Sequence, residues 1–279
     1  MLENRSLLDM SVLENSGMFD MGKLDALNSA TKYPSILTYH ALGERGALSE
    51  ELTIFDGFDG VTYLTEKIDG TNGRIVVLPG SADYFIGSRE ELLYARGDRV
   101  GNPAMGIVEA LKPLAERLVQ SHLSDFHRPI VTLYLEVFGG KIGGQAKQYS
   151  AKGAVGYRLF DVNSTEMDVL GWERSRISSW RDDGGQEFLD VDALQSLADG
   201  LDIPSVPYLS VVGGGDLPKD VEGMSAFLTK HLSESQAGLD ETAGRQPEGL
   251  VLRSLDRSRI AKARFQDYER TLKRRRQRR

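Results

Sequence analysis

The chain has 279 residues, of which 40% are hydrophobic and 27% charged, and its formal net charge at pH 7 is −7. A chain of this length and composition can bury one substantial core or two smaller ones. No apolar run approaches the roughly 18 residues of a membrane-spanning helix, and the N-terminus lacks the charged start and apolar core of a signal peptide. We therefore expect a soluble, cytoplasmic (intracellular) protein with no membrane partner, and the absence of cysteine fits a reducing compartment.

The first 32 residues are predicted to form an N-terminal lead-in segment. Their apolar residues, which include Leu7, Leu8, Met10, Val12 and Leu13, show only weak periodicity. A regular amphipathic helix or half-buried strand would repeat its apolar residues at a fixed spacing. We expect residues 1–32 to pack loosely ahead of the main domain, which we place at residues 33–268.

Two strands joined by a turn are predicted next. Residues 60–64 and 75–78 have the apolar and β-branched composition of strands. Gly70 and Gly73 lie between them and have the backbone freedom that a tight turn requires. We therefore expect the chain to reverse between residues 64 and 75.

Lys67 precedes this turn and is followed two residues later by Asp69 and Gly70. Enzymes that attach a nucleotide to their own lysine present the nucleophile with this K-x-D-G spacing. A lysine with an ordinary pKa of about 10.4 is almost wholly protonated at pH 7. A nucleophilic lysine therefore needs desolvation or neighbouring cations to lower its pKa. The spacing predicts a covalent lysyl-nucleotide intermediate, and the alternative is a solvated Lys and Asp beside a turn.

Three helices are predicted between the candidate site segments. Residues 107–123 carry apolar side chains at helical spacing, and residues 191–197 and 221–232 have the pattern of shorter helices. The spacing predicts that each helix packs one apolar face on the rest of the domain.

The last segment, residues 269–279, is predicted to be a basic C-terminal tail. It carries seven cationic residues, which are Arg270, Lys273, Arg274, Arg275, Arg276, Arg278 and Arg279. Because net charge is a poor guide when charges are unevenly distributed, a net charge of −7 does not exclude a nucleic-acid partner. The tail could hold a nucleic-acid backbone, and the alternative is a disordered solubilising tail.

Five further short segments follow the K-x-D-G stretch in order. They are residues 87–90 (GSRE), 133–140 (LYLEVFGG), 157–162 (YRLFDV), 247–252 (PEGLVL) and 260–264 (IAKAR). Together with residues 65–74 (TEKIDGTNGR), their order and content resemble the six motifs of the covalent nucleotidyltransferase superfamily of ligases and capping enzymes. The chain most resembles the ATP-dependent RNA ligases of the nick-sealing (type 2) family.

This resemblance implies an α+β fold, in which a nucleotidyltransferase (ATP-grasp-like) domain over residues 33–268 holds the nucleotide between twisted antiparallel sheets with helices outside. It also implies an ATP-dependent RNA ligase that uses Mg²⁺ (or Mn²⁺). Such an enzyme forms lysyl-AMP, transfers AMP to an RNA 5′ phosphate and seals it to a 3′ hydroxyl. The expected partner is RNA with 5′ phosphate and 3′ hydroxyl ends.

The resemblance also assigns roles to individual residues. Lys67 would attack the α-phosphorus of ATP, Asp69 would orient it, and Lys262 and Arg264 would neutralise the phosphates. The metal ligand would be Glu248. The expected nucleotide-binding residues are Glu66 at the adenine edge, Asn72 near the reacting phosphate, Arg74, Arg89 at the sugar-phosphate, Glu136 at the ribose, and Phe160 and Val251 on the two faces of adenine.

Each of these residues also has a purely structural interpretation. Glu136 could face outward on a half-buried strand, Phe160 could belong to the core, and Glu248 could be a turn carboxylate. Lys262 and Arg264 could form one solvated face of a strand. Arg264 also departs from the lysine that many relatives carry, and because an arginine does not give up a proton at physiological pH, only Lys262 could act there as a general acid.

Other functions remain possible at this level. A DNA ligase or a capping guanylyltransferase would share the motifs, and a catalytically inactive nucleotide-binding or RNA-binding module is a third alternative. Only 15 residues follow Arg264. We therefore expect the appended C-terminal domain of the relatives to be missing, and a partner protein could supply it.

Overall fold

The computed structural model describes residues 19–54, 57–78, 83–96, 98–99, 106–120 and 130–277. One group of strands comprises β1 (Leu37–Thr38), β4 (Val61–Lys67), β12 (Tyr208–Gly213), β13 (Gly249–Ser254) and β14 (Ile260–Arg264). A second group comprises β5 (Thr71–Val77), β6 (Tyr84–Ser88), β7 (Leu92–Ala95), β8 (Asp98–Arg99), β9 (Ile130–Gly139), β10 (Val155–Thr165) and β11 (Glu187–Phe188). The short strands β2 (His40–Leu42) and β3 (Leu48–Leu52) pair with each other.

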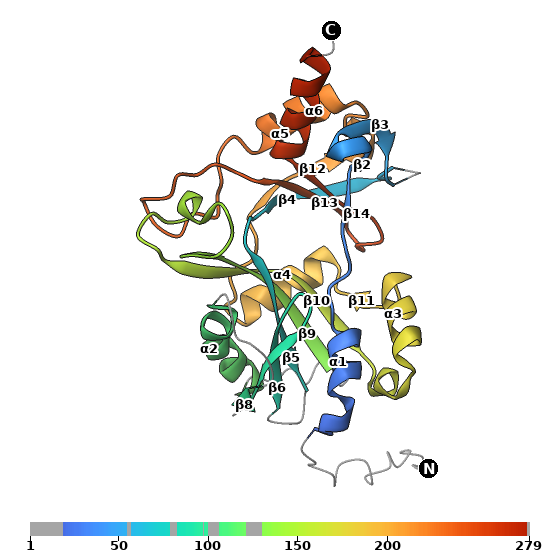
Figure 1. Cartoon of the computed structure of the whole chain (residues 1–279), viewed down its shortest axis with the longest axis vertical. Helices are drawn as coiled ribbons and strands as arrows, with labels where there is room; N and C mark the ends of the chain where they lie inside the picture. The colour runs from blue at the N-terminus through green and yellow to red at the C-terminus, as the bar shows by residue number, and fades with distance from the viewer. Residues whose placement is uncertain are drawn as a thin grey trace, which may run out of the picture.

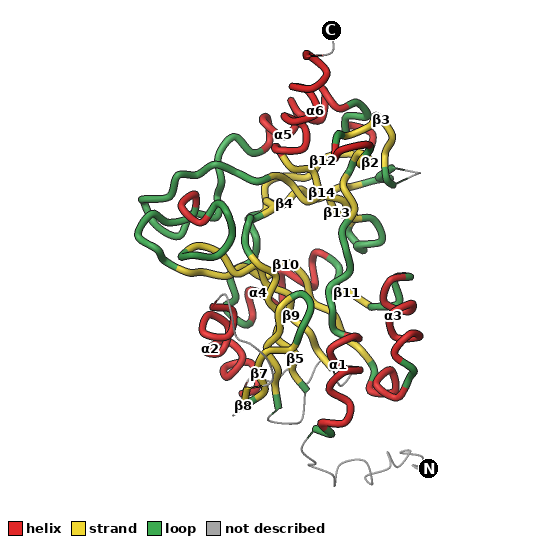
Figure 2. The backbone as a smooth tube through the Cα atoms, in the orientation of Figure 1, coloured by secondary structure: helices red, strands yellow, loops and turns green. Residues whose placement is uncertain are grey.

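The first group forms a five-stranded sheet in the order β1-β14-β13-β4-β12, and the second forms a seven-stranded sheet in the order β11-β10-β9-β5-β6-β7-β8. Neighbouring strands run antiparallel except β1, which is parallel to β14. Figure 1 shows the two sheets one above the other, with helices around them, and Figure 2 shows the same arrangement by type of structure. The predicted α+β fold with two antiparallel sheets and outer helices is confirmed.

The helices are α1 (Leu24–Ala30), α2 (Ile107–Gln120), α3 (Arg174–Asp182), α4 (Val191–Gly200), α5 (Val221–His231) and α6 (Phe265–Gln277). The predicted helices at 107–123, 191–197 and 221–232 are confirmed as α2, α4 and α5, with residues 121–123 lying outside the described part of the chain. No helix in the described ranges is long and apolar enough to cross a membrane.

Apolar side chains cover both faces of the seven-stranded sheet at β5, where consecutive residues point to opposite sides. Ile75 and Val77 pack with apolar residues of α2, whereas Val76 packs with residues of α1 and α3. Both faces therefore carry apolar side chains, which explains the unbroken apolar run at the end of β5. Helices thus cover both sides of the sheet at β5.

The five-stranded sheet has only one face in a hydrophobic core. Leu64, Leu250 and Ala261 on that face pack against α5 and α6. The alternating residues on the other face are directed toward the seven-stranded sheet and line the pocket described below. One face thus forms a hydrophobic core that stabilises the fold, and the other carries side chains that line the pocket.

The turn after Lys67 differs from its prediction in one respect. β4 ends at Lys67 and β5 begins at Thr71, so Gly70 lies in the turn but Gly73 lies inside β5. A Cβ at Gly73 would lie 2.8 Å from Leu111 Cδ1 of α2, and a Cβ at Gly70 would lie 2.4 Å from Val137 O. Close packing against backbone therefore requires glycine at Gly70, whereas at Gly73 the nearest atom is the end of a leucine side chain, and neither position has an unusual backbone angle.

The two ends of the chain also differ in detail from the expected segments. Leu7 to Leu13 lie outside the described residues, but Phe19, Leu27 and Ala30 of the N-terminal region are buried in a core cluster. At the other end, α6 runs without a break through residue 269 to Gln277. Most of the basic segment is therefore helical.

Candidate active site

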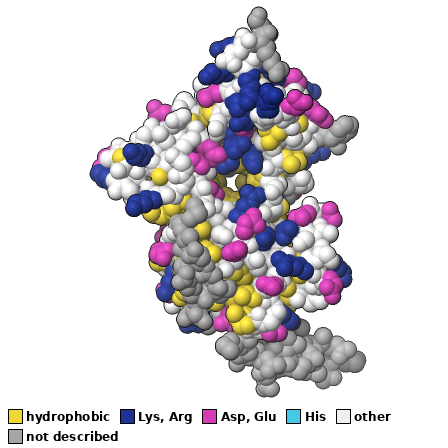
Figure 3. Space-filling view, in the orientation of Figure 1, with side chains coloured by type: hydrophobic (Ala, Val, Ile, Leu, Met, Phe, Trp, Pro, Cys, Tyr) yellow, Lys and Arg dark blue, Asp and Glu magenta, His cyan; other side chains and the backbone are white. Residues whose placement is uncertain are grey.

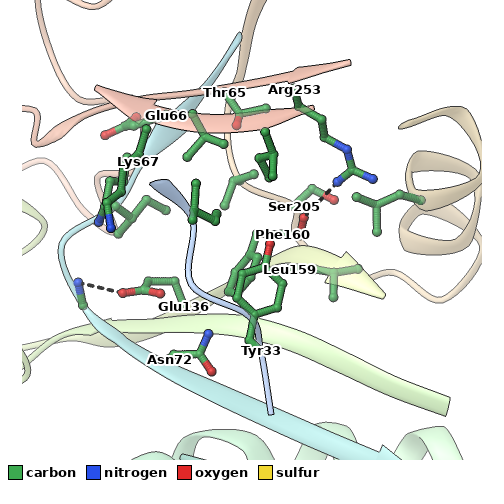
Figure 4. Close-up of a pocket in the computed structure, with 18 of the residues that line it drawn as sticks. Tyr33, Thr65, Glu66, Lys67, Asn72, Glu136, Leu159, Phe160, Ser205 and Arg253 are labelled. Carbon is green, nitrogen blue, oxygen red and sulfur yellow. Dashed lines mark hydrogen bonds between the residues drawn. The ribbon is translucent and has the colours of Figure 1, made fainter. Parts of the chain in front are cut away.

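A pocket of about 460 Å³ lies between the two sheets. Figure 4 shows its side chains projecting from both sheets toward a common space. The five-stranded sheet contributes residues of β4, β12, β13 and β14, and the seven-stranded sheet contributes residues of β5, β9 and β10. Residues of α4 and of the segment before β1 also line the pocket.

The register of three strands gathers the cations. In one row across the sheet, Gly249 of β13 pairs with both Lys67 and Arg264, and in the next row Val251 pairs with both Thr65 and Lys262. Side chains two residues apart on a strand share a face. Lys67, Lys262 and Arg264 therefore project from one face into the pocket, and all three line it.

Lys67 is held by an ion pair at the end of β4. Its Nζ donates a hydrogen bond to Glu248 Oε2 at 2.7 Å, and the two side chains are 25% and 13% exposed. Burial raises the pKa of Glu248, and the Lys67 ammonium opposes that shift. The predicted nucleophile and the predicted metal ligand thus touch, although they are 181 residues apart in the chain.

Lys262 and Arg264 flank the pocket beyond Lys67. Burial lowers the pKa of the Lys262 amine, and the neighbouring Arg264, Lys67 and Arg89 lower it further. Arg264 Nε donates to Asp267 Oδ2 at 2.8 Å, while its side chain remains one-third exposed. The remaining guanidinium N–H groups can therefore contact an anion in the pocket.

Asn72 and Glu136 are neighbours on the opposite wall, where β5 pairs with β9. Glu136 Oε1 accepts the Gly70 N–H at 3.0 Å, and burial raises the pKa of Glu136 to about 7. Among the described residues, Asn72 Oδ1 is buried and has no hydrogen-bond partner. Figure 4 shows both side chains beside the pocket, where each can offer an oxygen to a polar ligand.

Strand alternation places Phe160 on the pocket face of β10. Arg158 pairs with Glu136 of β9, which lines the pocket, and Phe160 lies two residues further along the same strand. The register then shifts between Leu159 and Asp161, so Phe160 is the additional residue of a β-bulge and the following Asp161 also comes to the pocket face, opposite Tyr134. Val251 lines it from the opposite sheet, so an aromatic ring and an aliphatic side chain are available to a planar base.

Glu66 borders the pocket, but its carboxylate is directed elsewhere. The side chain is 1% exposed and accepts hydrogen bonds from Ser235 Oγ and the Gln236 N–H. Burial raises its pKa, and these bonds oppose the shift. Its expected contact with the adenine edge stays a prediction.

Two other predicted residues lie at different distances from the pocket. Arg89 lines it, and its NH2 group donates to Ser35 Oγ at 2.7 Å. Arg74 does not line it: the side chain is completely buried, and its NH2 group contacts Asn28 Oδ1. Burial lowers the pKa of Arg74 to about 10. Arg74 shares a face of β5 with Asn72 but contacts α1 through Asn28, and its expected contact with the nucleotide stays a prediction.

Asp69 follows Lys67 in the turn but does not line the pocket. Its backbone N–H donates to the Tyr149 hydroxyl at 2.6 Å. The carboxylate belongs to the negative surroundings of the site, because its charge contributes to the raised pKa values of Glu136 and Glu248. Its expected role in orienting Lys67 stays a prediction.

Sequence reasoning missed a polar cluster that joins the two sheets. Asp161 of β10 is fully buried and pairs with Arg253 of β13, whose NH1 lies 3.3 Å from Oδ1. Arg257 and the Tyr33 hydroxyl both contact Asp161 Oδ2, the latter at 2.8 Å. The signal was present, since Asp161 directly follows Phe160 and Arg253 directly follows residues 247–252, but strand pairing alone could not show that they meet.

Arg253 and Ser205 add polar atoms to the lining of the pocket. Both residues line it, and among the described residues Arg253 Nε and Ser205 Oγ are buried without a hydrogen-bond partner. Figure 4 places them beside Phe160 and Leu159. Buried polar atoms of this kind are satisfied when a ligand supplies the partner.

The carboxylates around Lys67 fit a loosely held Mg²⁺ or Mn²⁺. The described residues contain no group of three or more His, Cys, Asp or Glu side chains arranged as a metal cage. Mg²⁺ usually takes one or two carboxylates and fills its remaining positions with water and phosphate oxygens. Glu248, with Glu136 nearby, matches that demand for oxygen ligands.

The two sheets thus enclose a pocket lined by cations, with Lys67 at the end of a strand. The family model for RNA ligase matches residues 61–271, which is most of the chain. The chain therefore belongs to the RNA ligase family. Comparison with curated proteins gives no match.

Solved structures of Naegleria gruberi RNA ligase have the same fold. A form with ATP and Mn has a TM-score of 0.50 and 18% identity, covering 78% of this chain and 53% of that one. An apo form gives 0.50 and 17% over the same shares, and another form with ATP and Mn gives 0.50 and 18%, covering 86% and 62%. The chain thus spans about half of the length of the first two structures.

Proposed function

We propose that this protein is an ATP-dependent RNA ligase that attaches AMP to Lys67, transfers it to an RNA 5′ phosphate and seals that end to a 3′ hydroxyl. The observation that carries the proposal is the position of Lys67 at the strand end, in contact with Glu248 and beside Lys262 and Arg264. Membership of the RNA ligase family favours RNA over the DNA ligase and capping alternatives.

In the first step the Lys67 amine attacks the α-phosphorus of ATP, a P–N bond forms, and the bond to pyrophosphate breaks. Lys67 must first give up a proton, and Glu248 Oε2 is the hydrogen-bond acceptor on its Nζ. Arg264 and Lys262 neutralise the negative charge that the leaving pyrophosphate carries. Lys262, with its lowered pKa, can also donate a proton to that leaving group.

In the later steps a 5′ phosphate oxygen of RNA attacks the lysyl-AMP phosphorus, and the Lys67 nitrogen leaves and regains its proton. The 3′ hydroxyl then attacks the adenylated 5′ phosphate and AMP departs. Phe160 and Val251 would keep adenine between them throughout, and Glu136 would hold the ribose. Mg²⁺ or Mn²⁺ held by Glu248 would act as a Lewis acid on phosphate oxygens.

The nick-sealing preference comes from the resemblance of residues 65–74 to that type of ligase. A nick aligns the 5′ phosphate and 3′ hydroxyl on one template, so the protein would not need to capture two free ends. The assembled site argues against an inactive module, because Lys67, Glu136, Glu248 and Lys262 occupy one region of the molecule.

The proposed function is tested by incubating the protein with α-labelled ATP, GTP or NAD and Mg²⁺, followed by denaturing electrophoresis. We expect label from ATP that is stable in alkali and lost in acid, as a phosphoramidate is. Lys67→Ala should remove the label, whereas Lys230→Ala, at an exposed lysine of α5, should retain it. Label retained in Lys67→Ala would exclude Lys67 as the nucleophile.

A further inference from the structure

Helix α6 concentrates positive charge next to the pocket. Five cationic residues lie in its described part (Arg270, Lys273, Arg274, Arg275 and Arg276), although the whole chain has a net charge of −7. The helix begins at Phe265, directly after the strand that places Lys262 and Arg264 in the pocket. The basic helix therefore begins next to the part of the pocket that Lys262 and Arg264 line.

A shared carboxylate connects the pocket to the helix. Asp267, which is 2% exposed, accepts Arg264 Nε on Oδ2 at 2.8 Å and Arg270 NH2 on Oδ1 at 2.7 Å. The two arginine side chains are 33% and 35% exposed. One negative charge thus fixes two guanidinium groups, and a positive charge remains between them.

Arg274, one helical turn after Arg270, is also fixed in place. Arg270 NH2 donates to Gly46 O at 2.7 Å, and Arg274 NH1, one helical turn later, donates to Arg45 O at 2.9 Å. Both acceptors are neutral backbone carbonyls in the turn between β2 and β3, so these bonds position the guanidinium groups without cancelling their charge. Figure 3 shows Lys and Arg side chains in a column that leads from the region of α6 toward the hollow between the sheets.

We propose that Arg264, Arg270 and Arg274, called here the arginine edge, bind consecutive backbone phosphates of the RNA strand whose 5′ phosphate reacts at Lys67. This proposal rests on the proposed ligase function. The planar fork of donors on arginine suits phosphate oxygens, and a guanidinium that is already positioned loses less entropy on binding. The edge would hold the strand as it leaves the pocket.

The two other arginines of α6 are less suitable for this path. Arg275 has the carboxylate of Glu50 as its own partner, so no net charge remains on that pair, whereas Asp267 is shared by Arg264 and Arg270. Arg276 is exposed and lies two residues after Arg274, about 200° further around the helix. Arg276→Gln therefore removes the same charge from the same helix but from a different side, and it serves as the matched control.

The test measures binding of a 5′-phosphorylated RNA oligonucleotide to the full chain by fluorescence anisotropy between about 50 and 200 mM salt. Arg274→Gln should weaken binding roughly 3- to 10-fold and lower the slope of log affinity against log salt by about 0.7, the value for one phosphate contact on a single strand. Arg270→Gln should act in the same direction, and Arg276→Gln should match the unsubstituted protein. Thermal unfolding checks that each variant is folded, and Arg274→Gln carries the test if Arg270→Gln is not.

The outcomes separate this proposal from the proposed function. If the unsubstituted protein takes no label from ATP, the ligase function fails. If it is labelled but Arg274→Gln and Arg276→Gln bind RNA with equal affinity and salt slope, the arginine edge is not the RNA surface. Single substitutions are preferred to truncation at residue 269, because truncation would remove the buried Thr271 that packs α6 on the domain.

Discussion

The two walls of the pocket use their strands differently. The five-stranded sheet presents Lys67, Lys262 and Arg264 by regular alternation from neighbouring strands. The seven-stranded sheet presents Glu136 and Phe160 by alternation as well, but it also uses an irregularity, since the bulge at Phe160 brings the following Asp161 to the pocket face. Regular pairing suffices to place the side chains that line the pocket, whereas the Asp161–Arg253 contact that joins the two sheets needs a local break in the pairing.

Burial acts in opposite directions on the charged groups of the two walls. It lowers the pKa of the Lys262 amine and raises the pKa of the Glu136 carboxyl to about 7. In both cases the poorly solvated pocket favours the neutral form. The direction of each shift therefore follows the charge of the group itself, as the raised pKa of Glu248 beside Lys67 also shows, while the physical cause is shared.

The largest loss of stability is expected where the two walls are joined. Asp161→Asn should lower the free energy of unfolding by about 3–5 kcal/mol, because it leaves the buried Arg253 and Arg257 without their counter-charge. Chemical denaturation measures the change. Asp59→Asn removes the exposed ion pair with Arg259 and should cost less than about 1 kcal/mol. Equal losses in the two variants would contradict the joining role of Asp161.

On the wall formed by the five-stranded sheet, Glu248→Gln keeps the shape of the side chain beside Lys67 and removes its charge. Self-adenylation should slow by roughly 100-fold, or about 3 kcal/mol, because the acceptor beside Lys67 and the expected metal ligand are lost together. Label incorporation across a Mg²⁺ titration measures the effect, with unfolding curves as the control for folding. Near-normal labelling at every Mg²⁺ concentration would refute the role.

On the opposite wall, Glu136→Gln tests the effect of burial on the carboxyl. The folded-state pKa of Glu136 is raised to about 7, so between about pH 4.5 and 7 the folded protein binds more protons than the unfolded chain and loses stability as the pH rises. Glutamine does not titrate. From about pH 5 to about pH 8, Glu136→Gln should gain on the order of 2 kcal/mol relative to the unsubstituted protein. Denaturation profiles that stay parallel across this range would contradict the shift.

The smallest effect is expected at the base-binding surface. Phe160→Leu should raise the KM for ATP roughly 5-fold, or about 1 kcal/mol, with little change in kcat, because stacking contributes to binding rather than to the reacting centre. Phe58→Leu, in the core of the five-stranded sheet, is the control and should change stability without changing KM. An unchanged KM in Phe160→Leu would place adenine elsewhere.

Several features could be predicted from the sequence because they depend on local order. The K-x-D-G turn ends a strand at Lys67, the apolar spacing of residues 107–120 produces α2, and the order of the short motifs indicated a family whose membership the family match confirms. The assigned roles of Lys67, Glu136 and Glu248 stay predictions that the experiments above address. Arg74 shows the limit of this reasoning, since it shares a face of β5 with Asn72 and its position near the K-x-D-G stretch says nothing about α1, whose Asn28 its buried side chain contacts.

The amino-acid sequence was enough to predict the fold class, through the resemblance of its ordered motifs to a known superfamily, and the chemical types available to the site, because motif order and turn residues can be read along the chain. The tertiary structure decided which of them meet. Asp161 reaches Arg253 only because two sheets pack together and β10 bulges just before Asp161, and Arg270 and Arg274 are fixed only because α6 packs on the β2–β3 turn. Such contacts depend on strand register and helix packing over long distances in the chain, which local patterns do not encode.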